Sequence, residues 1–157
     1  MPESDGNAHR IVVGVDGSES SLAALRWAVR QGGFTGATVD AVAAWEYPAA
    51  MAGYGWVAIP PTADLDFSEI AAKTLAEAIS RAVDPASDVK ISPRVAEGTP
   101  AGVLLEAAKD AELLVVGSRG HGGFAGALLG SVSQHCVSHA TCPVLVLRSA
   151  PADGAAK

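Results

Sequence analysis

The sequence has few cysteines and no long apolar run. Cys136 and Cys142 are the only cysteines in 157 residues. Two cysteines are too few for a framework of disulfides, so a reducing, cytoplasmic location is expected. No apolar run approaches the roughly 18 residues that a membrane-spanning helix needs. The polar residues 1–10 do not resemble a secretory signal, so none is expected.

Basic residues are also scarce. The chain has 11 Lys and Arg against 17 Asp and Glu, with a net charge of −6 and a sequence pI near 5.1. This balance argues against a general nucleic-acid binder, which would need a basic face. Apolar residues make up 49% of the chain and charged residues 18%, which favours one globular domain with a core that needs no disulfides.

Acidic residues are absent from one part of the chain. Residues 113–152 contain no Asp or Glu, yet they include six glycines between Gly117 and Gly130, with Arg119 and His121 among them. Such a stretch suits an anion, because glycines let main-chain N–H groups approach a ligand and a helix N-terminus is electropositive. The alternative is that a buried strand and helix simply carry few charges of either sign.

Apolar strands and amphipathic helices alternate along the sequence. Strands are expected at residues 10–15, 38–45, 89–96, 113–116 and 144–147. Helices are expected after Ser18 or Ser20 as far as Gly32-Gly33, from Asp64 to Val83, from Thr99 to near Asp110, and from Ser131 to Ala140. Pro93 predicts an edge position or a bulge for the third strand.

This alternation predicts a single α/β domain over residues 10–149, with disordered residues 1–9 and 150–157. The expected architecture is an open, Rossmann-like sheet of five parallel strands with helices on both faces. Ligands of such sheets bind at the carboxyl ends of the strands, where the strand order switches. Asp16, Ala44 and Gly117 lie at the carboxyl ends of predicted strands, so we expect them to converge on one crevice.

The connection over residues 46–63 is unusually long and contains aromatic residues. Loops of this length are often functional. Two interpretations remain equally open: a segment that folds over a ligand, or a surface flap packed on its own side chains.

Two familiar phosphate-binding motifs are excluded. No glycine precedes a lysine, so a Walker A loop is absent. A dinucleotide-binding fingerprint over residues 120–125 lacks its acidic ribose partner, because the first acidic residue that follows it is Asp153. The fingerprint would also lie in the last βα unit instead of the first.

The pattern Gly117-x2-Gly120-x9-Gly130-Ser131 resembles the nucleotide-binding signature of the universal stress protein family, ATP-binding type. The resemblance covers residues 10–148 and includes IVVGVDGS, VAAW, EGTP, AELLVVGSRGHGG and CPVLVLR. It implies an adenine nucleotide alpha-hydrolase-like fold, ATP as the ligand, with Mg²⁺ left open, and a homodimer through the last strand, Val144–Leu147. One departure is Ala43, where many relatives have histidine.

The resemblance also implies roles for individual residues. Asp16 and the main chain of Ala44 would hold the adenine. The ribose and first phosphates would lie along Val116, Gly117 and Gly120, and the outer phosphates would bind Gly130, Ser131 and Val132. Arg119 is a further candidate for a phosphate contact, although a solvated loop charge is the simpler interpretation.

Catalysis is not expected. Hydrolysis of ATP usually needs a metal held by carboxylates and a group that orients water, and Asp16 is the one carboxylate expected at the site. We therefore predict a nucleotide-binding regulatory or stress-response protein that is not an enzyme. The alternatives are a slow ATPase or nucleotide hydrolase using Asp16 and a bound metal, and a structural dimer without nucleotide. The sequence leaves ATP, AMP and cyclic AMP undistinguished.

His135 and His139 are spaced i, i+4 on the last predicted helix. Two ligands are too few for a structural zinc site, so surface or interface histidines are the simpler interpretation. Cys136 and Cys142 are interpreted as small buried hydrophobes, with a redox switch as the alternative.

Overall fold

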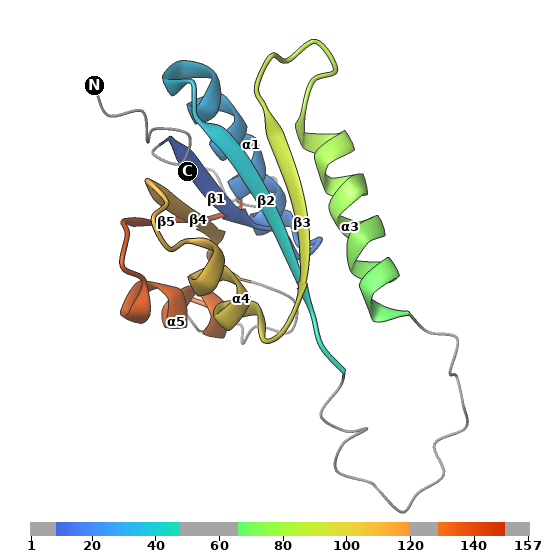
Figure 1. The fold of residues 1–157 in the computed structure, drawn as a ribbon, viewed down its shortest axis with the longest axis vertical. Coiled ribbons are helices and arrows are strands. Elements are labelled where there is room, and N and C mark those ends of the chain that lie inside the picture. The colour runs from blue at the N-terminus through green and yellow to red at the C-terminus, as the bar shows by residue number, and fades with distance from the viewer. Residues whose placement is uncertain (1–8, 48–65, 120–128, 150–157) are drawn as a thin grey trace, which may run out of the picture.

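The computed structural model describes residues 9–47, 66–119 and 129–149, which form one parallel five-stranded sheet flanked by helices (Figure 1). The strands are β1 (Arg10–Gly14), β2 (Thr38–Trp45), β3 (Ile91–Glu97), β4 (Leu113–Gly117) and β5 (Val144–Leu147). Their order is β3-β2-β1-β4-β5. The predicted fold class is therefore confirmed, and the strand order switches between β1 and β4.

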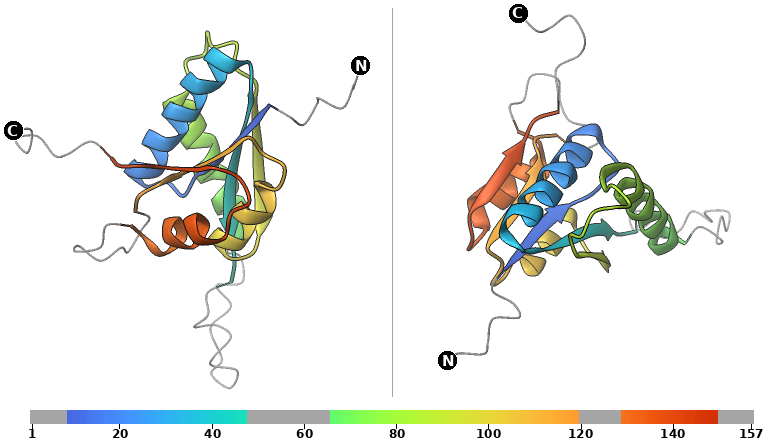
Figure 2. Two further views of the ribbon diagram at one scale, coloured as in Figure 1. Left: turned by 90° about the vertical axis from the view of Figure 1, so that its left-hand side faces the viewer. Right: turned by 90° about the horizontal axis from the view of Figure 1, so that it is seen from above.

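Helices cover both faces of the sheet (Figure 2). They are α1 (Glu19–Thr35), α3 (Phe67–Ala82), α4 (Pro100–Ala107) and α5 (Ser131–His139). Side chains of β1 alternate between two cores, because successive residues of a strand point to opposite faces. Val13 packs with α1 and α3, around Leu25 and Leu75, whereas Val12 packs with α4 and α5, around Leu104. Because helices cover both faces of the sheet, the ends of the strands are the parts of the sheet left open for a site.

The expected end of the first helix at Gly32-Gly33 was wrong. Helix α1 continues to Thr35 and ends at Gly36, whose φ of 80° is the left-handed conformation that glycine tolerates best. Gly32 has a packing function instead: a Cβ there would lie 3.0 Å from the carbonyl oxygen of Ala37 and 3.1 Å from Val39. A glycine inside a helix can thus allow a close approach of the sheet instead of ending the helix.

Other boundaries differ by a few residues. Strand β3 begins at Ile91 instead of residue 89, and α4 ends at Ala107 instead of near Asp110. Asp66, not Asp64, caps α3, through a hydrogen bond of 3.2 Å from the Glu69 main-chain N–H. These shifts are ordinary for helix and strand ends, where several polar residues can serve as caps.

Several expectations were met by the described residues. Ser18 caps α1, Thr99 caps α4, and Pro100 occupies the first turn of α4. Strand β3 is an edge strand and Pro93 is exposed on it, which explains how the sheet accommodates a proline. The predictions for residues 1–8, 150–157 and most of 46–63 fall outside the described part of the chain. Over the part that is described, no helix has the length and apolarity needed to cross a bilayer.

Candidate functional site

The switch point brings the carboxyl ends of β1 and β4 side by side. Ile11 pairs with Leu113 and Val13 with Val115, so the segments that follow both strands leave the sheet at the same edge. On the other side of β1, Gly14 pairs with Val42, and β2 therefore extends past the end of β1. Ala44 lies on this overhang, where it pairs with Ala96 of β3.

The turn after β1 presents a carboxylate at this edge. Asp16 is exposed, and its Oδ1 atom accepts a hydrogen bond of 2.8 Å from the Ser18 main-chain N–H. Gly17 has a φ of 84°, a conformation that glycine adopts without strain. Ser18 then caps α1 by accepting a hydrogen bond of 3.2 Å from the Ser21 N–H. The turn is therefore held by local hydrogen bonds before any ligand binds.

Gly117, at the end of β4, faces the first turn of α1. A Cβ at this position would lie 2.6 Å from the carbonyl carbon of Ser20 and 2.8 Å from the amide nitrogen of Ser21. Both neighbours are main-chain atoms and have little freedom to move. The missing side chain of Gly117 therefore makes room for a helix of this chain, a role that the sequence analysis had not anticipated.

Hydroxyl groups of α1 hold the residue that follows β4. The Ser20 hydroxyl donates to the main-chain oxygen of Arg119 and accepts from the Arg119 N–H at 3.4 Å. The Ser18 hydroxyl lies 3.5 Å from the same oxygen. These contacts join segments about a hundred residues apart in the sequence, and they place a main-chain carbonyl over the N-terminus of α1.

Helix α5 begins differently. Its N-cap is Gly130, and among the described residues no side chain caps it. The Gly130 N–H donates to the main-chain oxygen of Ser118 at 2.6 Å, which anchors the helix start to the end of β4. The first turn of a helix has main-chain N–H groups without partners inside the helix, and it carries roughly half a positive charge. Of the two helix N-termini at the switch point, α5 is therefore the one suited to receive an anion.

The predicted site residues fall into three groups. Asp16, Gly117, Arg119, Gly130, Ser131 and Val132 gather at the switch point, and Ala44 lies at the same edge on β2. Val116 is adjacent, but its side chain is buried in the core, so only its main chain could meet a ligand there. Gly120 lies outside the described residues.

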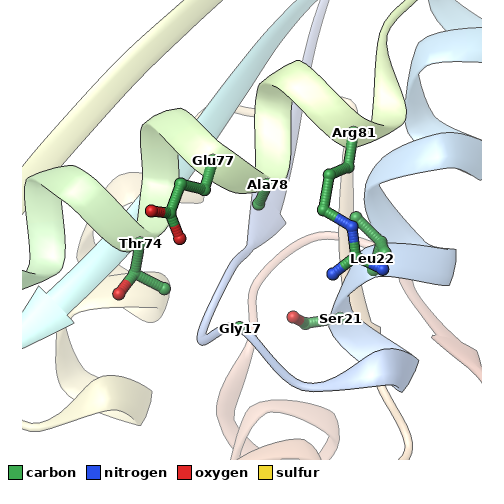
Figure 3. A pocket seen from close by; sticks show the side chains of 7 residues that line it. All are labelled: Gly17, Ser21, Leu22, Thr74, Glu77, Ala78 and Arg81. Carbon is green, nitrogen blue, oxygen red and sulfur yellow. The ribbon is translucent and has the colours of Figure 1, made fainter.

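A shallow hollow adjoins the Asp16–Gly17 turn on the side of α3 (Figure 3). Its lining residues come from that turn, the start of α1 and one side of α3: Gly17, Ser21, Leu22, Thr74, Glu77, Ala78 and Arg81. Arg81 also lies 3.9 Å from Glu19 across the two helices, a long and exposed ion pair. Such a pair contributes little to stability. The lining of the hollow contains no residue of α5.

The two histidines of α5 are exposed, whereas the two cysteines are wholly or partly buried. His135 and His139 stack with ring centroids 4.3 Å apart, and both are exposed. The described residues contain no cluster of three or more metal-binding side chains. Cys136 is fully buried, and burial, assisted by nearby Cys142, raises its pKa to about 11. Burial also raises the pKa of Cys142, so both thiols are protonated at neutral pH and behave as small hydrophobes.

Comparison with known proteins identifies the family. A model of the universal stress protein family matches residues 7–148. The chain belongs to the universal stress protein family. A universal stress protein of Mycolicibacterium smegmatis is 38% identical over 138 residues, which cover 88% of this chain and 45% of that relative. A second one, from Mycobacterium tuberculosis, is 38% identical over 140 residues, covering 88% of this chain and 43% of its own length. The chain thus spans less than half the length of these curated relatives.

A solved structure extends the similarity to three dimensions. A universal stress protein crystallised in complex with cAMP is 30% identical, has a TM-score of 0.62, and is matched over 90% of this chain and 98% of its own. A family structure from Archaeoglobus fulgidus in complex with dAMP shares the fold, with a TM-score of 0.63 at 22% identity, covering 88% of this chain and 96% of that one. Each of these two family members was thus crystallised with an adenine nucleotide.

Sequence reasoning missed two residues that organise the site, Ser20 and Ser133. Ser20 was considered only as an alternative helix cap, and Ser133 was not considered. Both are buried, and both bond to main-chain atoms at the end of β4. Serine is common and usually exposed, so only their contacts across the fold reveal this role.

Proposed function

We propose that this universal stress protein is a cytoplasmic regulatory module that binds an adenine nucleotide, ATP, at the switch point between β1 and β4. The observation that carries the proposal is the N-terminus of α5, which no side chain of the described residues caps and which is anchored to the end of β4. A phosphate there would receive main-chain hydrogen bonds and the favourable end of the helix dipole.

The surroundings of α5 support a phosphate ligand. The sequence has no acidic residue between residues 113 and 152, so no neighbouring carboxylate in that stretch repels an anion. Ser131 is exposed at the first helical position and offers a hydroxyl. The solved relative with bound cAMP makes an adenine nucleotide the natural choice of ligand class.

Asp16 is the proposed partner of the adenosine end. It is exposed at the same edge as Ala44, and a carboxylate accepts hydrogen bonds from ribose hydroxyls or an exocyclic amine. Mg²⁺ would be held mainly by the phosphates. Within the described part of the site, Asp16 would offer the ion a carboxylate oxygen. When bound, the ion would neutralise phosphate charge.

The direct test is calorimetric titration of ATP into the whole protein and into the Gly130→Val variant. Gly130 has a φ of −74° and a ψ of 169°, which other residues adopt without strain, so the variant should fold. We expect wild type to bind ATP and the variant to lose binding while its circular dichroism and thermal unfolding stay close to wild type. Equal affinities would place the phosphates elsewhere.

We further propose that binding is not coupled to efficient hydrolysis. The described residues hold no cluster of metal-binding side chains, and Asp16 is one carboxylate where phosphoryl transfer usually uses more. Phosphate release measured over hours should remain at background. Steady release that Asp16→Ala abolishes would instead establish a slow nucleotide hydrolase. If no adenine nucleotide binds, a structural dimer becomes the better account.

A homodimer through β5 completes the proposal. Strand β5 is an edge strand whose four residues, Val144–Leu147, are all apolar and only half-buried. The oxygens of Pro143 and Leu147 bond to β4, so by alternation the Val146 N–H points away from the sheet. Val146→Pro removes that outward donor and keeps the pairing with β4. Analytical ultracentrifugation should show a dimer for wild type and a monomer for the variant; a wild-type monomer would contradict the proposal.

A further inference from the structure

Buried hydroxyls are concentrated around the end of β4. Four polar residues are buried in the described structure, and all four are serines: Ser20, Ser21, Ser118 and Ser133, with exposures of 4%, 4%, 6% and 2%. A buried hydroxyl costs free energy unless it is hydrogen-bonded, so the placement of these side chains requires a reason.

Ser20 holds the main chain that leaves β4. Its hydroxyl bonds to both the oxygen and the N–H of Arg119, which is as much as one side chain can bond to a single residue's main chain. Gly117 lets α1 approach closely enough for this contact. The first turn of α1 therefore fixes the position of the Arg119 main chain just after β4.

Ser133 holds the start of α5. Its hydroxyl lies 3.1 Å from the main-chain oxygen of Ser118 and 3.0 Å from that of Gly130, so one proton is shared between the two carbonyls. The Gly130 N–H bonds to the same Ser118 oxygen at 2.6 Å. The start of α5 is thus tied to the end of β4 by two donors.

We propose that Ser20 and Ser133 are positioning residues for the phosphate site, an inference that rests on the proposed function. They hold the Arg119 main chain and the α5 N-terminus at a fixed separation without contacting the nucleotide. Both groups are then in place before a phosphate arrives, and binding does not pay the conformational entropy of ordering them. Both hydroxyls are neutral, so they fix this geometry without attracting or repelling the phosphate.

The test compares ATP with adenosine, which has no phosphate. Calorimetry on the whole protein should show ATP affinity reduced about tenfold in Ser20→Ala and in Ser133→Ala, the effect of losing one useful hydrogen bond. Adenosine affinity should be unchanged in both variants. The matched control is Ser87→Ala, whose hydroxyl accepts only a local bond from the Val89 N–H, far from the site in the chain; it should bind both ligands like wild type.

A second measurement does not depend on nucleotide binding. Amide hydrogen exchange by NMR should be about ten times faster at Gly130 in free Ser133→Ala than in free wild type. Ser133→Cys, which keeps side-chain volume and a weak donor, covers the case in which Ser133→Ala does not fold.

The outcomes separate the two proposals. If wild type binds no ATP, the proposed function fails, while the exchange of Gly130 still tests the anchoring. If wild type binds ATP and both variants bind it equally well, the positioning role is wrong. Equal losses of ATP and adenosine affinity would also overturn it, since these would indicate a general structural defect.

Discussion

The amino ends and the carboxyl ends of the strands are joined to the helices by different kinds of contact. At the amino end of β1, Arg10 lies 2.9 Å from Asp40 and also donates to the main-chain oxygens of Ala107 and Lys109, both at 2.8 Å. At the carboxyl end, the contacts are made by serine hydroxyls and by the missing side chain of Gly117. Charged side chains therefore make the contacts of Arg10 at the amino end, whereas neutral hydroxyls join β4 to α1 and α5 at the carboxyl end.

The difference follows from helix dipoles. The Arg10 guanidinium caps the electronegative C-terminus of α4, so its charge is used within the fold. At the other edge, a charged fastener near α5 would either cancel the electropositive N-terminus or compete for the same anion. Neutral hydroxyls leave that potential for a ligand. The comparison teaches that, at the binding end, neutral hydroxyls join β4 to the two helices whose N-termini meet there.

The largest expected effect comes from removing the charged fastener. Arg10→Ala leaves Asp40 partly buried without its partner and the α4 carbonyls without a donor, and should lower the free energy of unfolding by about 3 kcal/mol. ATP affinity at a temperature where the variant is folded should match wild type. Urea unfolding and calorimetry would check both. A loss of ATP affinity as large as that of Gly130→Val would contradict the distinction between the two ends of the strands.

The exposed Lys109–Glu106 pair is the matched control for this change. Its atoms are 2.8 Å apart, and each partner shifts the other's pKa, raising that of Lys109 and lowering that of Glu106. Both side chains are exposed to solvent, which screens the pair. Lys109→Ala should therefore unfold at nearly the same urea concentration as wild type.

At the carboxyl end of β4, stability should depend on side-chain volume instead of on charge. Gly117→Ala places a Cβ against main-chain atoms of α1 and should cost about 2 kcal/mol of stability, with weaker ATP binding. Gly14→Ala is the control, because its Cβ would meet Leu104, a flexible side chain, 2.7 Å away. Urea titrations of the two variants should rank them in that order. A larger loss in Gly14→Ala would contradict the close approach of α1.

A smaller effect concerns the pH dependence of stability, because the Cys136 thiol is buried in the core and can ionise at high pH. The pKa of Cys136 rises from 9.0 to about 11 on burial, so the unfolded state releases this proton first as pH increases. Stability from this group is complete below pH 9.0 and falls between pH 9.0 and about 11, by about 1.4 kcal/mol at pH 10. Wild type should lose this much more stability than Cys136→Ala between pH 8 and pH 10. Parallel losses in both proteins would show that the thiol does not titrate this way.

Much of the fold could be predicted from the sequence, because apolar periodicity and caps are local signals. Thr38–Trp45, Val144–Leu147 and the Thr99 cap were predicted at the residues where the structure has them. Gly32 was misread because its reason, the approach of Ala37 and Val39, is visible only after folding. In a sequence, a glycine that ends a helix cannot be distinguished from one that lets another segment pack closely.

The site was less predictable than the fold. The convergence of Asp16, Ala44 and Gly117 on the carboxyl ends of the strands followed from the parallel topology, since strand ends converge at a switch point. The contacts that fix this gathering did not follow, because Ser20 and Ser133 bond to main-chain atoms and carry no sequence pattern of their own. Contacts between a side chain and a distant main chain leave no periodic trace in a sequence.

The most direct test of the account is an NMR titration of the uniformly ¹⁵N-labelled protein with ATP and, separately, with adenosine. We predict that ATP shifts the amide resonances of Ser131, Val132 and Ser133 most strongly, that adenosine leaves these three nearly unchanged, and that resonances around Arg10 and Asp40 move with neither. Shifts of equal size for ATP and adenosine at the α5 N-terminus, or no shift there at saturating ATP, would contradict the claim that the α5 N-terminus binds phosphate.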